Sequence, residues 1–153
     1  MVPSAPFPDQ ARTLGALLRA PYRKLAERLY AGLAAGGFPE IRPAHSAVFR
    51  HIAPEGSRLT DLAEQAELTK QSMAYLVGYL EEHGYVSLHP DPNDGRAKQV
   101  RLTRRGQAFI AALLKASAAV EDGLAAALGA TKLKQLRDLL EQADAALADD
   151  QLG

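Results

Sequence analysis

The sequence of 153 residues contains no cysteine. A chain without thiols cannot form disulfides, cannot sense oxidants through a cysteine and cannot hold zinc on thiolate ligands. It also has no apolar run close to the ~20 residues that a membrane-spanning helix needs. Its first residues, MVPSAPFPDQAR, lack the apolar core of a signal peptide. We therefore expect a cytoplasmic protein with no membrane partner.

The sequence has no excess of charge of either sign, since its formal net charge is zero. The charges are unevenly distributed, however. Between positions 96 and 105 there are five cations and no acidic residue, whereas from position 121 onward seven acidic residues face three basic ones. The length suits a single domain, residues 1–153, with a core of its own. The local basic segment is the feature that points to an anionic partner.

Apolar periodicity predicts a mainly α fold with one small β-hairpin, in the order four helices, two strands and two helices. Residues 1–9 contain three prolines and are expected to form a loose arm. A leucine stripe from Ala11 predicts the first helix, which Pro21 should kink or split. The last helix has apolar residues at alternating spacings of three and four, which is typical of a helix–helix seam.

Two short helices in the middle of the chain are predicted to form a helix-turn-helix. Thr60 is a plausible N-cap for the first helix and Thr69 for the second. Gly84 suits the left-handed turn that ends the second helix. The buried face of that helix recurs at the spacing i, i+3, i+4 and i+7 and consists of Met73, Leu76, Val77 and Leu80.

The outer face of this second helix, near its beginning, carries Lys70, Gln71, Ser72 and Tyr75. The major groove of DNA admits one helix, and the leading residues of that helix reach the base edges. Glutamine can bond adenine through two hydrogen bonds, serine can bond either kind of edge, and lysine can meet guanine or phosphate. The alternative is a solvated surface without a partner, because helix-turn-helix patterns are weak signals.

The stretch VSLHPDPNDGRAKQVRLT, residues 86–103, predicts a hairpin with a long polar loop. Such a loop can project as a wing, and Arg96 at its tip could enter a narrow minor groove. Asp94 could hold the guanidinium of Arg96 through a bidentate bond, while Gly95 lets the backbone turn. The alternative is a polar hairpin tip with an incidental salt bridge.

The run LTDLAEQAELTKQSMAYLVGYLEEHGYVSLHPDPNDGRAKQVRLTRRGQAF resembles the winged helix-turn-helix of the multiple antibiotic resistance regulator (MarR) family over about residues 57–109. The resemblance implies an obligate homodimer, with a DNA-binding lobe at 44–106 and dimerisation helices at 10–36 and 107–150. Residues 69–83 would be the recognition helix, with Arg96 steadied by Asp94 in the minor groove. The DNA-binding residues expected from the helix and the wing are Thr69, Lys70, Gln71, Ser72, Tyr75, Asp94, Arg96 and Lys98.

The resemblance also implies a repressor of double-stranded DNA at an inverted-repeat site, released by a small aromatic or anionic ligand. Tyr22, Tyr30 and His45 are weak candidates for contacting that ligand. Gly78 departs from the family pattern, where a polar residue is common, and either permits a close approach to DNA or is simply tolerated. The alternative function is an architectural dimer that binds DNA constitutively, without an effector.

Rival functions find little support in the sequence. A calcium loop that starts at Asp91 would have Gly95 and Leu102 where oxygen ligands belong. His45 and His51 are six residues apart and share a helix face poorly, so no metal or other cofactor is expected. Nucleophile elbows, phosphate loops and zinc-hydrolase patterns are missing, and we expect no enzymatic activity.

Overall fold

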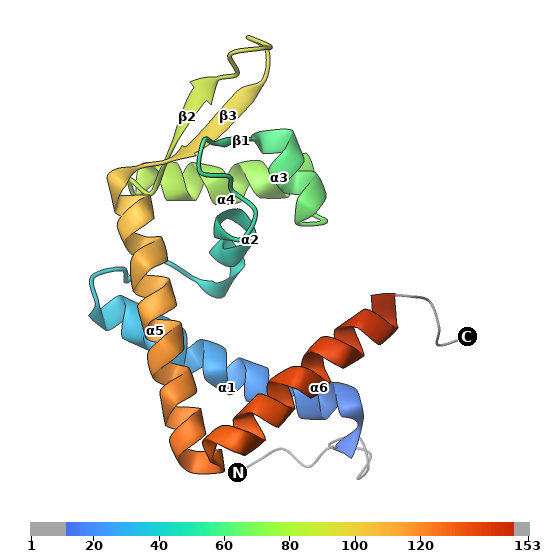
Figure 1. Cartoon of the computed structure of the whole chain (residues 1–153). Helices are drawn as coiled ribbons and strands as arrows, with labels where there is room; N and C mark the ends of the chain where they lie inside the picture. Colours follow the sequence, from blue (N-terminus) through green and yellow to red (C-terminus); the bar gives the residue numbers. More distant parts are fainter. Residues whose placement is uncertain (1–11, 149–153) are drawn as a thin grey trace, which may run out of the picture. The chain divides into compact units, whose positions relative to one another are not determined.

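The computed structural model describes residues 12–148, a mainly helical chain with one small antiparallel sheet (Figure 1). This confirms the predicted fold class. The expected arm at residues 1–9 and the outermost residues of the two expected dimerisation segments lie outside the described range. The elements are α1 (Leu14–Ala35), η2 (Pro43–His45), α2 (Ser46–Phe49), β1 (Ser57–Arg58), α3 (Leu59–Gln65), α4 (Lys70–Glu82), β2 (Val86–Pro90), β3 (Lys98–Leu102), α5 (Arg104–Leu128) and α6 (Ala130–Ala148).

The chain divides into two compact units, Met1–Ala116 and Ser117–Gly153. The second unit holds the end of α5 and all of α6, which are separated by Gly129 at a φ of 90°. Within it, Arg137 of α6 forms an ion pair with Glu121 of α5. Across the described residues, no helix combines the length and the apolar character needed to cross a membrane.

The core of the first unit lies where α4 and the sheet meet α2, α3 and the beginning of α5. Phe109 of α5 lies 4.5 Å from Phe49 of α2, measured between ring centroids, and 5.9 Å from Tyr85. Burial of this much apolar surface is the main force that stabilises the lobe. The buried apolar residues are Leu33, Ile41, Val48, Phe49, Leu62, Ala63, Met73, Val77, Leu80, Tyr85, Val86, Val100 and Phe109.

The helix α1 is continuous over 22 residues, although Pro21 lies inside it. Thr13 is its N-cap and accepts a hydrogen bond from the Ala16 N–H at 3.3 Å. Of the two effects expected of Pro21, a kink or a split, the split is therefore wrong. Leu29 and Leu33, on the C-terminal side of the proline, pack against the core and favour the helix beyond it.

The sheet contains one strand that periodicity did not predict. β1 pairs antiparallel with β3, so the sheet order is β1-β3-β2, with Ser57 opposite Val100. This pairing fixes Arg58 in an extended conformation as the N-cap of α3, and Thr60 lies inside the helix. The expected N-cap at Thr60 is thus wrong, because a long-range strand pairing sets where α3 begins.

Candidate nucleic-acid interface

The N-terminus of α4 is built as the sequence predicts. Thr69 caps the helix, and its hydroxyl oxygen accepts a hydrogen bond from the Ser72 N–H at 3.1 Å. The Thr69 hydroxyl in turn donates to the Ser72 hydroxyl oxygen at 2.9 Å. Met73, Val77 and Leu80 are fully buried, which anchors the inner face of the helix. The outer face is therefore fixed in orientation by the core beneath it.

The outer face of α4 leaves the expected base-reading side chains exposed. Lys70, Gln71 and Ser72 are solvent-exposed, and the Tyr75 side chain keeps 76% of its surface accessible. Figure 1 shows α4 lying beside the sheet, with the β2–β3 hairpin extending beyond the helices of the lobe.

The wing loop is organised by Asp91, for which the sequence predicted no role in the wing. Its side chain is almost fully buried, with 4% exposure. One carboxylate oxygen accepts hydrogen bonds from the N–H groups of Asn93 at 2.8 Å and Asp94 at 3.3 Å. The other accepts from Arg58 Nε at 2.5 Å. The Asn93 N–H, followed by the Arg58 guanidinium, holds the pKa of Asp91 below its usual range.

A second aspartate turn follows directly. The Asp94 carboxylate accepts a hydrogen bond from the Arg96 backbone N–H at 3.0 Å. The Asp94 carbonyl accepts from the Ala97 N–H, also at 3.0 Å, and the Asp91 N–H donates to the Ala97 carbonyl. Aspartate favours this geometry because its side chain can bond the backbone two residues further along. The tip of the wing is therefore a closed, hydrogen-bonded loop.

The expected bond between the two side chains at the tip is not what the structure contains. Within the described residues, no ion pair joins the Asp94 carboxylate to the Arg96 guanidinium. Asp94 instead bonds the backbone of Arg96, because the N–H lies within reach while the long side chain extends into solvent. Asp94 can still orient Arg96, but it does so by fixing the main chain at the arginine.

The wing is also tied to α4 by a contact that sequence reasoning missed. The Glu81 carboxylate, on the last turn of α4, accepts a hydrogen bond from the Leu88 N–H at 2.7 Å. β2 is an edge strand of the sheet, so this N–H has no neighbouring strand to pair with. The contact therefore links the helix and the hairpin that carry the candidate DNA-binding residues. No periodic signal marks a glutamate for this role.

The five cations of the basic segment do not all face solvent in the same way. Arg96 and Lys98 are exposed on the wing. Arg101 bonds Gln99, with 2.8 Å between its Nε and the amide oxygen. Arg105 instead forms an ion pair with Glu40 at 3.1 Å. Arg104 is exposed as well, so the cations available to an anionic partner lie on the wing and at the beginning of α5.

The three candidate ligand residues lie in different environments. Tyr22 is largely exposed on α1, whereas Tyr30 is half-buried, and burial raises the pKa of its hydroxyl. His45 is buried, and its ring stacks on Tyr79 with 4.6 Å between centroids. Its Nδ1 accepts the Arg42 N–H at 2.9 Å, and burial lowers the pKa of the ring. This environment marks His45 as a packed, neutral side chain.

A groove of about 570 Å³ lies between α2 and the N-terminal half of α4. Its walls are mostly apolar, and its polar groups come from residues at the beginning of α4 and of α2. The groove shares Gln71, Ser72 and Tyr75 with the exposed face of α4. Its lining residues are Pro43, Ala44, Ser46, Ala47, Ala66, Leu68, Gln71, Ser72, Tyr75 and Leu76.

The model of the MarR family matches residues 41–97, which span α2, α3, α4 and most of the wing. A solved structure described as the crystal structure of MarR is 26% identical, covers 88% of this chain and 98% of that chain, and superposes with a TM-score of 0.70. Over these residues the chain resembles the MarR family. This similarity supports a transcription regulator that binds DNA.

Two further solved structures share the fold of this chain. The transcriptional repressor CouR, bound to a 23-mer DNA duplex, is 24% identical, covers 92% of this chain and 95% of that chain, and has a TM-score of 0.69. The PcaV regulator from Streptomyces coelicolor, in complex with its natural ligand, is 23% identical, covers 91% and 96%, and has a TM-score of 0.64. None of the curated proteins is a significant sequence match to the chain.

Proposed function

We propose that the chain acts in the cytoplasm as a homodimeric repressor, which binds an inverted-repeat site in double-stranded DNA and is released by a small ligand. The observation that supports the DNA contact is that one lobe contains both an exposed face of α4 and a hydrogen-bonded wing with Arg96 at its tip. On this proposal α4 enters the major groove and Arg96 the adjacent minor groove. The contacting residues are Thr69, Lys70, Gln71, Ser72, Tyr75, Asp94, Arg96 and Lys98.

Exposed leucines support the homodimer. On α1, Leu14, Leu17 and Tyr22 keep more than half of their side-chain surface accessible, at 70%, 55% and 64%. On α6, Leu139 and Leu147 do so as well, at 63% and 67%. Stripes of this size on a soluble chain mark surfaces that a partner covers. A second copy, using α1 and the helices within 107–150, is the partner that we propose.

The groove beside α4 supports release by a ligand. A molecule bound there would contact Gln71 and Tyr75, the same side chains that we propose for reading bases, and would compete with DNA. The lining is apolar and aromatic without a charged residue, which suits the aromatic part of the expected effector. Two proteins with this fold have the corresponding properties: PcaV binds its natural ligand, and CouR is a transcriptional repressor.

Selection from random DNA duplexes tests the DNA-binding proposal. We expect an inverted repeat whose half-sites are roughly 10 bp apart, and an affinity that falls steeply as salt increases. Gln71→Ala should lose discrimination at particular base positions, at a cost of about 1–3 kcal/mol. Gln107→Ala, at an exposed glutamine on the first turns of α5, is the matched control. Recovery of no repeat, or equal base preferences in both variants, contradicts the proposal.

A thermal-shift screen of small aromatic acids tests the effector. A ligand that binds the folded chain raises the unfolding midpoint, and the same ligand should reduce DNA affinity about 5- to 150-fold. Peroxide should leave DNA binding intact because the chain has no cysteine. If no ligand changes DNA affinity, the architectural alternative, a dimer that binds constitutively, replaces the repressor. If peroxide reversibly abolishes binding, both are wrong.

A further inference from the structure

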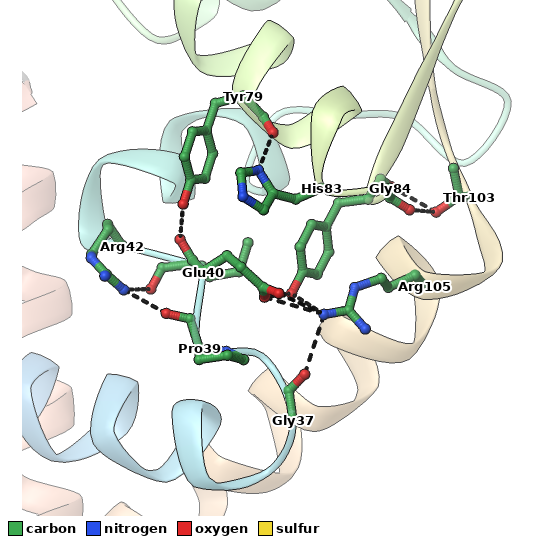
Figure 2. Close-up of polar contacts among 11 residues, drawn as sticks. Gly37, Pro39, Glu40, Arg42, Tyr79, His83, Gly84, Thr103 and Arg105 are labelled. Carbon is green, nitrogen blue, oxygen red and sulfur yellow. Dashed lines mark hydrogen bonds and ion pairs between the residues drawn. The ribbon is translucent and has the colours of Figure 1, made fainter.

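One cation of the basic segment is held by acceptors of the lobe. Figure 2 shows the Arg105 side chain directed toward Glu40 and Gly37. Its Nη2 lies 3.2 Å and 3.1 Å from the two carboxylate oxygens of Glu40 and 3.3 Å from the Gly37 carbonyl oxygen. The same nitrogen lies 3.0 Å from the Tyr85 hydroxyl. Arg105 therefore serves several acceptors inside the lobe.

Glu40 is the centre of this set of contacts. The Tyr85 hydroxyl donates to its carboxylate at 2.7 Å, and the Tyr79 hydroxyl donates to its backbone carbonyl at 2.9 Å. The Tyr85 bond, followed by the influence of Arg105, lowers the pKa of Glu40, while burial raises the pKa of Tyr85 to about 12. At neutral pH the tyrosine is therefore the donor and the glutamate the charged acceptor.

Aromatic rings hold the guanidinium from its other side. The Arg105 Cζ lies 4.7 Å from the Tyr85 ring centroid and 5.6 Å from that of Phe38. A planar guanidinium can stack on rings while its edge forms hydrogen bonds, and lysine cannot do both. The arginine is thus restricted in both direction and rotation.

The contacts join three segments that are distant in sequence. Glu40 belongs to the loop between α1 and η2, and Tyr85 connects α4 to β2. Arg105 lies on the first turn of α5, while Tyr79 lies on α4 itself. A single loop residue therefore bonds both the helix proposed to read DNA and the beginning of the helix that leaves the lobe.

We propose that Glu40, Tyr85 and Arg105 are positioning residues that fix the angle between α4 and α5, and thereby set the half-site spacing that the dimer accepts. The inference rests on the proposed function, a dimer on an inverted repeat. Apolar contacts between the lobe and α5 are non-directional, whereas charge-assisted hydrogen bonds to a guanidinium fix orientation. The ion pair is partly exposed, at 41% and 28%, so it contributes little to stability. Its effect on geometry can therefore be tested in a folded chain.

The test measures the affinity of the full chain for duplexes whose half-site separation varies in steps of one base pair. Each step shifts a half-site by about 3.4 Å and rotates it around the duplex axis. The parent should lose about tenfold or more per step, as for one mismatched base pair. Glu40→Gln, Tyr85→Phe and Arg105→Lys should flatten or shift this profile. Each should keep the base preferences of the parent within a half-site.

Glu55→Gln is the matched control, because Glu55 is an exposed carboxylate outside every ion pair of the described residues. Its spacing profile should equal that of the parent. An unchanged profile in the three variants overturns the inference, as does a loss of affinity that is equal at all spacings. If the parent chain binds no duplex at any spacing, the proposed function is refuted instead. The effect of the three residues on the angle between α4 and α5 is then tested by the distance measurement below.

A distance measurement tests the angle without DNA. The chain has no cysteine, so Asn93→Cys on the wing and Lys115→Cys on α5 can carry two spin labels within the first unit. With the labelled chain diluted into unlabelled chain, the parent should give a narrow distance distribution. Glu40→Gln and Arg105→Lys should broaden or move it, and Glu55→Gln should not. Identical distributions in all four overturn the inference, whether or not the melting temperatures differ.

Discussion

Replacing Gly78 with alanine should make the chain more stable and its complex with DNA weaker. Gly78 is an exposed residue in the interior of α4. It lies three residues after Tyr75 and seven after Gln71, so it shares their outer face. An alanine Cβ at this position would meet no atom within 4 Å. Nothing in the folded chain therefore opposes the substitution.

The expected gain follows from helix propensity. Glycine in a helix interior is about 0.8–1.0 kcal/mol less favourable than alanine. For a chain of this size, such a gain corresponds to a melting temperature higher by roughly 2–4 °C. DNA affinity should move in the opposite direction, because the new methyl group projects from the face that we propose for the major groove. A lost close contact costs roughly 1–3 kcal/mol, or roughly 5- to 150-fold in affinity.

Thermal unfolding and fluorescence anisotropy with one duplex at one salt concentration provide the two measurements. Gly32→Ala is the calibration, because Gly32 is exposed inside α1 and its Cβ would also meet nothing within 4 Å. It should raise stability by a similar amount, and it calibrates the stability gain only. If Gly78→Ala raises stability and leaves affinity unchanged, Gly78 is merely tolerated. If it lowers stability, our account of α4 is wrong.

Three further predictions concern the wing, a buried histidine and a close helix contact. Arg96→Ala and Asp94→Ala should each weaken DNA binding, and the double variant should resemble Arg96→Ala alone; tighter binding by Asp94→Ala would show that Asp94 merely repels phosphate. His45 has a lowered pKa, so the unfolded chain takes up its proton first and stability should fall as pH falls below the ordinary value of 6.5. His45→Asn, whose amide oxygen can still accept the Arg42 N–H, should remove this loss of stability when the free energy of unfolding is measured with urea at a series of pH values. An equal pH dependence in the parent and the variant would contradict this prediction. Gly106→Ala would drive a Cβ into the Tyr85 carbonyl and should destabilise the chain by about 1–3 kcal/mol or more in the same assay, whereas an unchanged midpoint would disprove the close approach.

Local signals were sufficient for the helix-turn-helix. Thr69 caps α4 because a threonine hydroxyl satisfies a free N–H at a helix start wherever the helix is placed. Gly84 adopts a φ of 79° because the helix end needs a left-handed residue. The inward face of α4 follows from the helical period alone. Each of these features depends on neighbours within a few residues, and such features can be read from sequence.

Features that depend on distant partners were missed. β1 is two residues long and has no pattern of its own; it exists because Ser57 and Arg58 meet β3, some forty residues later in the chain. In the sequence, Arg105 is one of five cations that cannot be distinguished. Its ion pair with Glu40 depends on a loop that lies 65 residues earlier in the chain. Charge and periodicity describe what a residue can do, whereas the fold determines which acceptor it meets.

The acidic residues of the lobe show why a chain with zero net charge can still bind a polyanion. Asp91 accepts two backbone N–H groups and the Arg58 guanidinium, and Asp94 accepts the Arg96 N–H. Glu81 accepts the Leu88 N–H, and Glu40 is shared between Tyr85 and Arg105. A carboxylate with internal donors has its negative charge partly compensated, so it repels a nearby phosphate less than a solvated one. The cations of the wing tip have no such internal acceptors among the described residues. The folded lobe therefore presents an uncompensated positive wing that the overall composition conceals, and two aspartates are compatible with a loop that we propose to face DNA.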